Sequence, residues 1–271
     1  MQLTIDNKTA YAYTGGKTLR TGQPTLVLIH GAQNDHSVWA LQSRYLANHG
    51  YNLIALDLPG HGLSAGPALS RVEDMADWVL AFLLQAGIEH AHLAGHSMGS
   101  LIALEASYRA PAVVSSLSLI GTAYPMKVSD ALLNAARDEE QSAIDMVNIW
   151  SHSGPVARAS CPAPGMSLHG MSRRLMQRIA TRNPAEKVFH IDFSACNAYA
   201  NGEAAAAAVR CPALFVLGQQ DMMTPAKAGK ALSAVIPHSQ VRVIANSGHS
   251  LMSEQGDAVL TAMQAFLQGQ R

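Results

Sequence analysis

AHLAGHSMGSLIALEASYRA, residues 91–110, joins a short apolar run to a longer helical one through a Gly-x-Ser-x-Gly turn. The apolar run is typical of a buried strand, and the second half predicts a helix that ends before Pro111. A serine in a sharp strand-to-helix turn has a strained backbone, and the residues two positions before and after it must be small. Gly95 and Gly99 meet that requirement. We therefore expect the Ser97 hydroxyl at the carboxyl edge of a sheet, where open α/β folds bind ligands.

Apolar runs of strand length alternate with helical patterns on both sides of this turn. Continuous apolar strands between helices indicate an α/β fold with a parallel sheet covered on both faces. The alternation around Asn7-Lys8 predicts an N-terminal antiparallel hairpin. The further predicted strands are 25–30, 52–57, 91–96, 115–121, 213–218 and 240–246. The predicted helices are 38–50, 72–87, 98–110, 225–236 with Thr224 as its N-cap, and 254–267.

The alternation stops between residues 122 and 209, where no strand is predicted. Helical patterns occupy about 129–151, 168–181 and 184–200, the last with Asn183 as N-cap and Pro184 in the first turn, and GEAAAAAV forms a short helix leading back to the sheet. We therefore expect one α/β core made of residues 1–121 and 210–271, with a helical cap, residues 122–209, inserted into it.

Composition narrows the class of protein. Hydrophobic residues make up 48% of the 271 positions and charged residues 14%, which favours a globular chain with a large core. Nineteen basic residues balance nineteen acidic ones, so no overall field recruits nucleic acid or an anionic membrane. No apolar run is long enough to span a bilayer, and the N-terminus lacks signal-peptide features. The three widely spaced cysteines suit free thiols in a reducing, cytoplasmic compartment.

Two further polar residues follow predicted strands. Asp221 lies just after the strand at 213–218, and His249 lies in the loop after the strand at 240–246. A serine hydroxyl is a weak nucleophile unless a base removes its proton and an acid orients that base. The order Ser97, Asp221, His249 supplies nucleophile, acid and base at the same edge of the sheet.

These residues and their surroundings resemble the α/β-hydrolase superfamily, specifically serine hydrolases with a helical cap. The motifs that carry the resemblance are His30-Gly31, DLPGHGLS (57–64), GHSMGS (95–100), GQQD (218–221) and NSGHS (246–250). The resemblance implies a mostly parallel eight-stranded sheet and catalysis by Ser97, Asp221 and His249 without a cofactor.

The loop after the first parallel strand is expected to stabilise negative charge. Acyl transfer develops an oxyanion, which two preorganised backbone N–H groups should face. One donor is Met98, directly after the nucleophile. In relatives with this short loop the other is the residue after His-Gly, here Ala32, with Gln33 as the alternative. Asp57 and His61 are expected only to shape their own loop.

The polar side chains of the same loop also raise the question of a metal or phosphate site. His30 ends a buried strand and is better explained as a hydrogen-bonded core histidine than as a metal ligand beside Asp35 and His36. No CxxC or HExxH pattern supports a metal, and the loop lacks the lysine of a phosphate loop. We therefore expect neither a metal nor a cofactor.

The expected activity is hydrolysis of a small to medium, largely apolar carboxylic ester through an acyl-enzyme. Because only neutral His249 accepts the serine proton, activity should fall at acid pH. Many methionines in the cap and beside the triad loops suit an adaptable apolar pocket. The residues expected to contact substrate are Gln33, Trp39, Met126 and Met222.

Other reactions of the same machinery stay open. They are lactone opening, C–C bond hydrolysis, thioester hydrolysis and transfer to an acceptor other than water, as in acyltransferases and perhydrolases. A non-catalytic small-molecule receptor on the same fold is the remote alternative. The sequence gives no indication of the oligomeric state.

Overall fold

One eight-stranded sheet organises the fold, in the order β1-β2-β4-β3-β5-β6-β7-β8. The computed structural model describes residues 1–154, 157–160, 162–182 and 184–270. The β1–β2 and β2–β4 pairs are antiparallel, and all other neighbours are parallel. This confirms the predicted α/β class with a mostly parallel eight-stranded sheet. The strands are β1 (Gln2–Ile5), β2 (Lys8–Tyr13), β3 (Thr25–Ile29), β4 (Asn52–Leu56), β5 (Ala91–His96), β6 (Val114–Ile120), β7 (Ala213–Gly218) and β8 (Gln240–Ile244).

Burial along the strands explains why their sequences are continuous apolar runs. Every residue of β3, β4, β5 and β7 is buried, because helices cover both faces of the sheet at these strands. The edge strand β8 is exposed at Gln240, Arg242 and Val243, and its sequence is less apolar.

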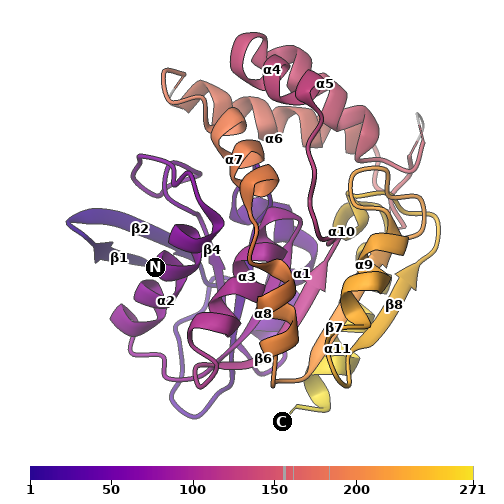
Figure 1. The fold of residues 1–271 in the computed structure, drawn as a ribbon. Helices are drawn as coiled ribbons and strands as arrows, with labels where there is room; N and C mark the ends of the chain where they lie inside the picture. The colour runs from indigo at the N-terminus through magenta and orange to yellow at the C-terminus, as the bar shows by residue number, and fades with distance from the viewer. Residues whose placement is uncertain (155–156, 161, 183, 271) are drawn as a thin grey trace.

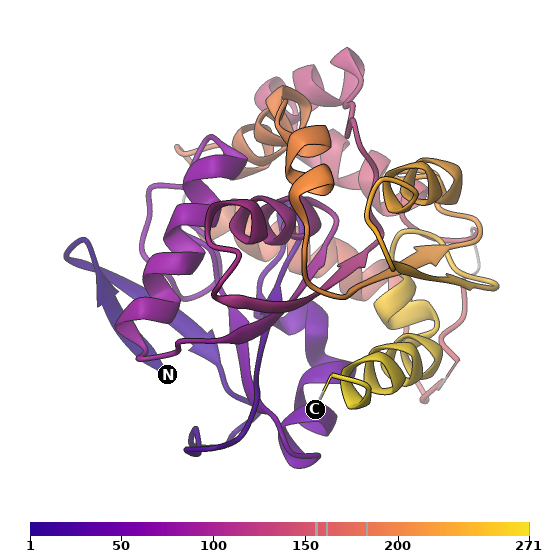
Figure 2. The ribbon, with the colours of Figure 1, turned by 60° about the horizontal axis from the view of Figure 1, so that its bottom comes forward.

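The helices form two layers, one on each face of the sheet, and each layer has its own hydrophobic cluster. On one face α2, α3, α8 and α9 pack against side chains such as Val27 and Ile54. On the other face α1, α10 and α11 pack against Leu26 and Leu53. Figure 2 shows the yellow α11 on the side of the strands opposite to α3. These helices are α1 (Ala40–Asn48), α2 (Val72–Gln85), α3 (Met98–Arg109), α8 (Gly202–Ala208), α9 (Ala226–Ser233), α10 (Leu251–Glu254) and α11 (Gly256–Gln268), and a 3-10 turn, η1 (His36–Trp39), precedes α1.

Four helices between β6 and β7 lie together at one end of the sheet (Figure 1). We call them the cap helices: α4 (Asp130–Asp138), α5 (Glu140–Trp150), α6 (Leu168–Arg182) and α7 (Val188–Ala198). They share a small apolar core that includes Ile144, Met176 and Phe193. The following α8 packs instead against the sheet layer. The division into a core and an inserted cap at residues 122–209 stays a prediction.

Three helix boundaries differ from those predicted. The helix expected from Pro184 begins at Val188, because Lys187 adopts a left-handed φ of +53° that a continuous helix cannot contain. Asn183, the expected N-cap, lies outside the described residues. The helix expected over 129–151 is divided at Glu139, which has a non-helical φ of −138°. The helix expected over 254–267 begins at Gly256, because Gln255 has a non-helical φ of −129°.

The predicted cap of the helix at 225–236 is also wrong. The helix begins at Ala226 and Pro225 is the residue at its N-cap. The Thr224 side chain instead donates a hydrogen bond to Asp221, and this contact belongs to the site described below.

None of the described helices is both long and apolar enough to cross a membrane.

Candidate active site

Ser97 lies between β5 and α3 with a strained backbone. Its φ of +53° and ψ of −120° fall outside the regions that residues with a side chain normally occupy. The turn is possible only with glycine on both sides. A Cβ on Gly95 would lie 2.0 Å from the Gly99 carbonyl oxygen, and one on Gly99 would lie 2.3 Å from that of Ile29. Strain of this kind persists where the surrounding structure enforces it, and it is frequent at functional sites.

Asp221 and His249 meet after β7 and β8. The Asp221 Oδ2 atom lies 2.8 Å from His249 Nδ1, and Oδ1 accepts the backbone N–H groups of Met223 and Thr224. Burial alone would raise the pKa of the Asp221 carboxyl. The charge of His249 and these hydrogen bonds outweigh burial and hold that pKa below its usual value. An ionised Asp221 can fix the histidine tautomer in which Nε2 is free to accept a proton.

Ser97 and His249 line one cavity of about 170 Å³. The wall of this cavity is mostly apolar, and none of its described lining residues is Asp, Glu, Lys or Arg. Five methionines contribute to it: Met166, Met171, Met176, Met223 and Met252. Helix α6 lies across the cavity and supplies Leu168, Met171, Ser172, Leu175 and Met176.

The loop after β3 lies directly against the serine. A Cβ on Gly31 would lie 3.1 Å from the Ser97 Cβ, so the loop approaches the nucleophile through a residue without a side chain. Gln33 donates its backbone N–H to Asp192 Oδ2 at 2.8 Å, which disfavours it as an oxyanion donor. Ala32 lines the cavity, and Met98 opens α3 beside Ser97. The assignment of their two amides as the oxyanion donors stays a prediction.

Comparison with known proteins gives the family. Residues 26–262 match the model of the alpha/beta hydrolase family. The chain belongs to this family. The (E)-2-((N-methylformamido)methylene)succinate hydrolase of Acinetobacter baylyi is 28% identical to this α/β hydrolase, over 97% of this chain and 95% of that protein. The putative carbamate hydrolase RutD of Klebsiella pneumoniae is 26% identical over 90% of this chain and 91% of that protein.

Solved structures share the α/β-hydrolase fold. The enol-lactonase from Burkholderia xenovorans has a TM-score of 0.83 at 21% identity and covers 99% of this chain and 100% of its own. The esterase from Exiguobacterium antarcticum has a TM-score of 0.81 at 19% identity over 98% and 97%. Family membership, together with relatives that are named as hydrolases, supports a general hydrolase activity for the protein. They leave open which bond it cleaves.

The four residues expected to contact substrate in this α/β hydrolase lie elsewhere. Gln33 is buried and donates its Nε2 to the Met176 carbonyl. Trp39 and Met126 are buried in the hydrophobic clusters on opposite faces of the sheet. Met222 is 68% exposed, whereas its neighbour Met223 lines the cavity. None of the four is among the described residues that line the cavity. Their contact with substrate stays a prediction.

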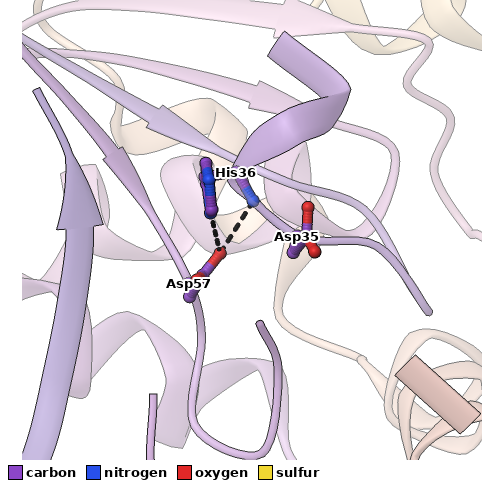
Figure 3. A group of neighbouring side chains, drawn as sticks. All are labelled: Asp35, His36 and Asp57. Atoms are coloured by element: carbon purple, nitrogen blue, oxygen red, sulfur yellow. Dashed lines mark hydrogen bonds and ion pairs between the residues drawn. The ribbon is translucent and has the colours of Figure 1, made fainter. Parts of the chain in front are cut away.

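Asp35, His36 and Asp57 form a close polar group at the end of β4 (Figure 3). Asp57 Oδ1 lies 2.8 Å from His36 Nδ1 and accepts the His36 backbone N–H, and Arg178 of α6 binds Asp35 Oδ2. Burial lowers the pKa of His36, but the bond to Asp57 outweighs it and the net shift is upward. Because Arg178 places positive charge against Asp35, the group is better explained as a junction between loop and cap than as a cation site.

Three residues that the structure brings to the site have no role there in the sequence-based prediction. Thr224 contacts both Asp221 and His249, and His96 donates its Nε2–H to the His249 carbonyl at 2.9 Å. Burial, followed by the charge of His249, lowers the pKa of His96 to about 3, so this ring is neutral. Asp192 is buried in α7 and binds the loop after β3. A lone carboxylate within the apolar stretch VFHIDFSAC was a signal that could have identified Asp192.

Proposed function

We propose that the protein hydrolyses small to medium, largely apolar carboxylic esters through an acyl-enzyme. The observation that carries the proposal is that Ser97 and His249 line one mostly apolar cavity in which no described lining residue is Asp, Glu, Lys or Arg. An uncharged ester enters such a cavity without leaving a buried charge unpaired.

The proposed reaction has two halves, formation and hydrolysis of the acyl-enzyme, and the same residues act in both. His249 takes the Ser97 proton as the hydroxyl attacks the acyl carbonyl, and Asp221 stabilises the imidazolium that forms. The N–H groups of Ala32 and Met98 stabilise the oxyanion. His249 then gives its proton to the leaving alcohol. Water attacks the acyl-enzyme with His249 again as the base, and Ser97 is restored.

The lining also argues against substrates that carry charge. The name of the Acinetobacter baylyi relative describes a derivative of succinate, a dicarboxylate. Recognition of carboxylates normally uses arginine or lysine. No such side chain occurs among the described lining residues, so we propose an uncharged substrate for this chain.

The first experiment replaces Ser97 with alanine. Wild-type protein should hydrolyse short p-nitrophenyl esters and gain one adduct with a fluorophosphonate, detected by intact mass. Ser97→Ala should lose the adduct and at least ~10³-fold in kcat. Undiminished turnover by Ser97→Ala would contradict the assignment. A panel of esters, lactones, thioesters and dienones then separates ester hydrolysis from the other reactions of the same machinery.

A further inference from the structure

A buried carboxylate of the cap holds the loop that approaches Ser97. Asp192 of α7 has no solvent exposure. Its Oδ2 accepts the Gln33 backbone N–H at 2.8 Å and lies 2.9 Å from His61 Nε2. Gln33 belongs to the loop after β3, and His61 to the loop after β4. One oxygen of the cap thus joins two loops of the sheet.

The hydrogen bonds define the protons on His61. Its Nδ1 lies 3.0 Å from the Pro59 carbonyl, which only accepts, so Nδ1 carries a proton. When Nε2 also donates to the Asp192 carboxylate, the ring is an imidazolium. Burial lowers the pKa of His61, but the charge and hydrogen bond of Asp192 outweigh burial and the net shift is upward. The geometry and this shift favour a protonated ring paired with the Asp192 carboxylate, and solvent does not reach the contact.

The neighbouring His30 completes the support of the loop. Its Nε2 accepts the Leu58 backbone N–H at 3.1 Å, so its proton lies on Nδ1, which donates to the Gly31 carbonyl at 2.8 Å. The His30 and His61 rings pack with their centres 4.8 Å apart. Burial, followed by the charge of His61, lowers the pKa of His30 to about 4 and keeps it neutral.

Ala32 is held between these two attachments. The Gly31 carbonyl before it is bonded by His30, and the Gln33 amide after it is bonded by Asp192. The Gln33 backbone has a φ of +54°, a conformation unfavourable for a residue with a side chain. Gln33 Nε2 further donates to the Met176 carbonyl of α6. The cap thus stabilises a strained loop conformation that would otherwise be free to relax.

Stability alone is a poor reason for this arrangement. An ion pair removed from water loses about as much in hydration as it gains by attraction. The second oxygen of Asp192, Oδ1, is also buried without a described partner. A carboxylate kept at this cost is more readily explained by what it positions than by the stability it provides.

We propose that Asp192 is a positioning residue, through which the cap fixes the loop at Gln33 so that the Ala32 amide faces the oxyanion formed at Ser97. The proposal rests on the proposed function for the oxyanion role, whereas the attachment of the loop can be tested without any activity. Asp192 itself touches no reacting atom. It acts through the Gln33 amide.

The experiment compares two substitutions of similar size. Asp192→Asn keeps an oxygen that can accept the Gln33 N–H, and Asp192→Leu removes the acceptor. Asp145→Asn is the matched control, because Asp145 is a half-exposed cap carboxylate that pairs with Arg173 away from the loop. Each protein is assayed for kcat and KM with a p-nitrophenyl ester, and active enzyme is counted by fluorophosphonate adduct.

Activity should depend on whether residue 192 can accept the Gln33 N–H, and not on the size of its side chain. Asp192→Leu should lose ~10²-fold or more in kcat with KM changed less than about threefold, as expected for a lost oxyanion donor. Asp192→Asn should stay within about tenfold of wild type, and Asp145→Asn should equal it. A Leu variant with wild-type kcat, an Asn variant that falls as far as Leu, or a change confined to KM would each overturn the proposal.

Hydrogen exchange gives a second, independent readout. The Gln33 amide should exchange slowly in wild type and in Asp192→Asn, and at least about tenfold faster in Asp192→Leu. Equal protection of the Gln33 amide in wild type and in both variants would show that Asp192 does not hold the loop, even if activity changed. If wild type hydrolyses no ester and takes no adduct, the proposed function fails while the exchange result still decides the attachment. Should Asp192→Leu not fold, Asp192→Ala is used, with the same expected direction in both assays.

Discussion

The Thr224 hydroxyl ties the candidate acid to the candidate base. Its Oγ1 donates to Asp221 Oδ2 at 2.8 Å and lies 3.0 Å from His249 Nδ1. The hydroxyl therefore contacts both the carboxylate and the imidazole. All three side chains are buried. A hydroxyl in this position limits how far the carboxylate can rotate away from the imidazole.

Replacing Thr224 tests this role at the scale of one atom. Thr224→Val keeps the shape and removes the hydroxyl, and a hydrogen bond to a charged group is worth ~1.5–3 kcal/mol, so kcat should fall about 10- to 100-fold. Thr224→Ser keeps the hydroxyl and should retain most of the activity. Steady-state kinetics on one p-nitrophenyl ester measure both. Equal rates for the Val and Ser variants would show that the hydroxyl has no such role.

Single residues also mark the limit of what the sequence predicts. Ser97, Asp221 and His249 could be chosen as candidates in advance because each follows a predicted strand. Asp192 and His61 are separated by 131 positions, and no local pattern connects them. Met222 and Met223 are adjacent and chemically identical, yet the first is exposed and the second lines the cavity. Which of two neighbours faces inward in a loop depends on tertiary packing.

At the scale of elements, prediction succeeds for segments that are buried on both faces, because their residues must be apolar throughout. Strands such as β5 and β7 are buried on both faces, which demands continuous apolar residues that a sequence displays directly. The cap helices are buried along one side only and against each other, so their ends are decided by backbone conformations such as that of Lys187. The larger boundary errors accordingly lie outside the sheet strands, whose ends are predicted to within two residues.

Helix α6 should set the size of the acyl group, because it supplies five side chains to the cavity wall. Leu175→Trp narrows the cavity. It should lower kcat/KM for an octanoyl ester about tenfold or more relative to an acetyl ester, since one methylene in an apolar pocket is worth ~1–3 kcal/mol. Arg174→Gln, on the adjacent exposed position, is the control. An equal loss of kcat/KM for the octanoyl and acetyl esters would mean that α6 does not select the length of the acyl chain.

At the scale of the whole molecule, buried histidines link folding to pH in two directions. His30 and His96 are neutral when folded, with pKa values lowered by burial to about 4 and about 3. Both must take up protons on unfolding below their ordinary pKa of ~6.5, so acidification favours the unfolded chain. His36 and His61 have raised pKa values. Their contribution is fully present below pH ~6.5 and is lost as the pH rises through their folded pKa.

These opposite signs predict greatest stability near pH ~6.5. Between pH 6.5 and 5.5 the free energy of unfolding should fall by about 2 kcal/mol, since His30 and His96 each contribute about 1 kcal/mol over that interval. Urea unfolding followed by circular dichroism at half-unit steps of pH measures the curve. His30→Asn removes one of the protons taken up on unfolding and should lessen the fall by about 1 kcal/mol, whatever it does to the absolute stability. An acid slope unchanged by that substitution would mean that His30 is not buried neutral, and the support it gives to the loop before Ala32 would have to be reassigned.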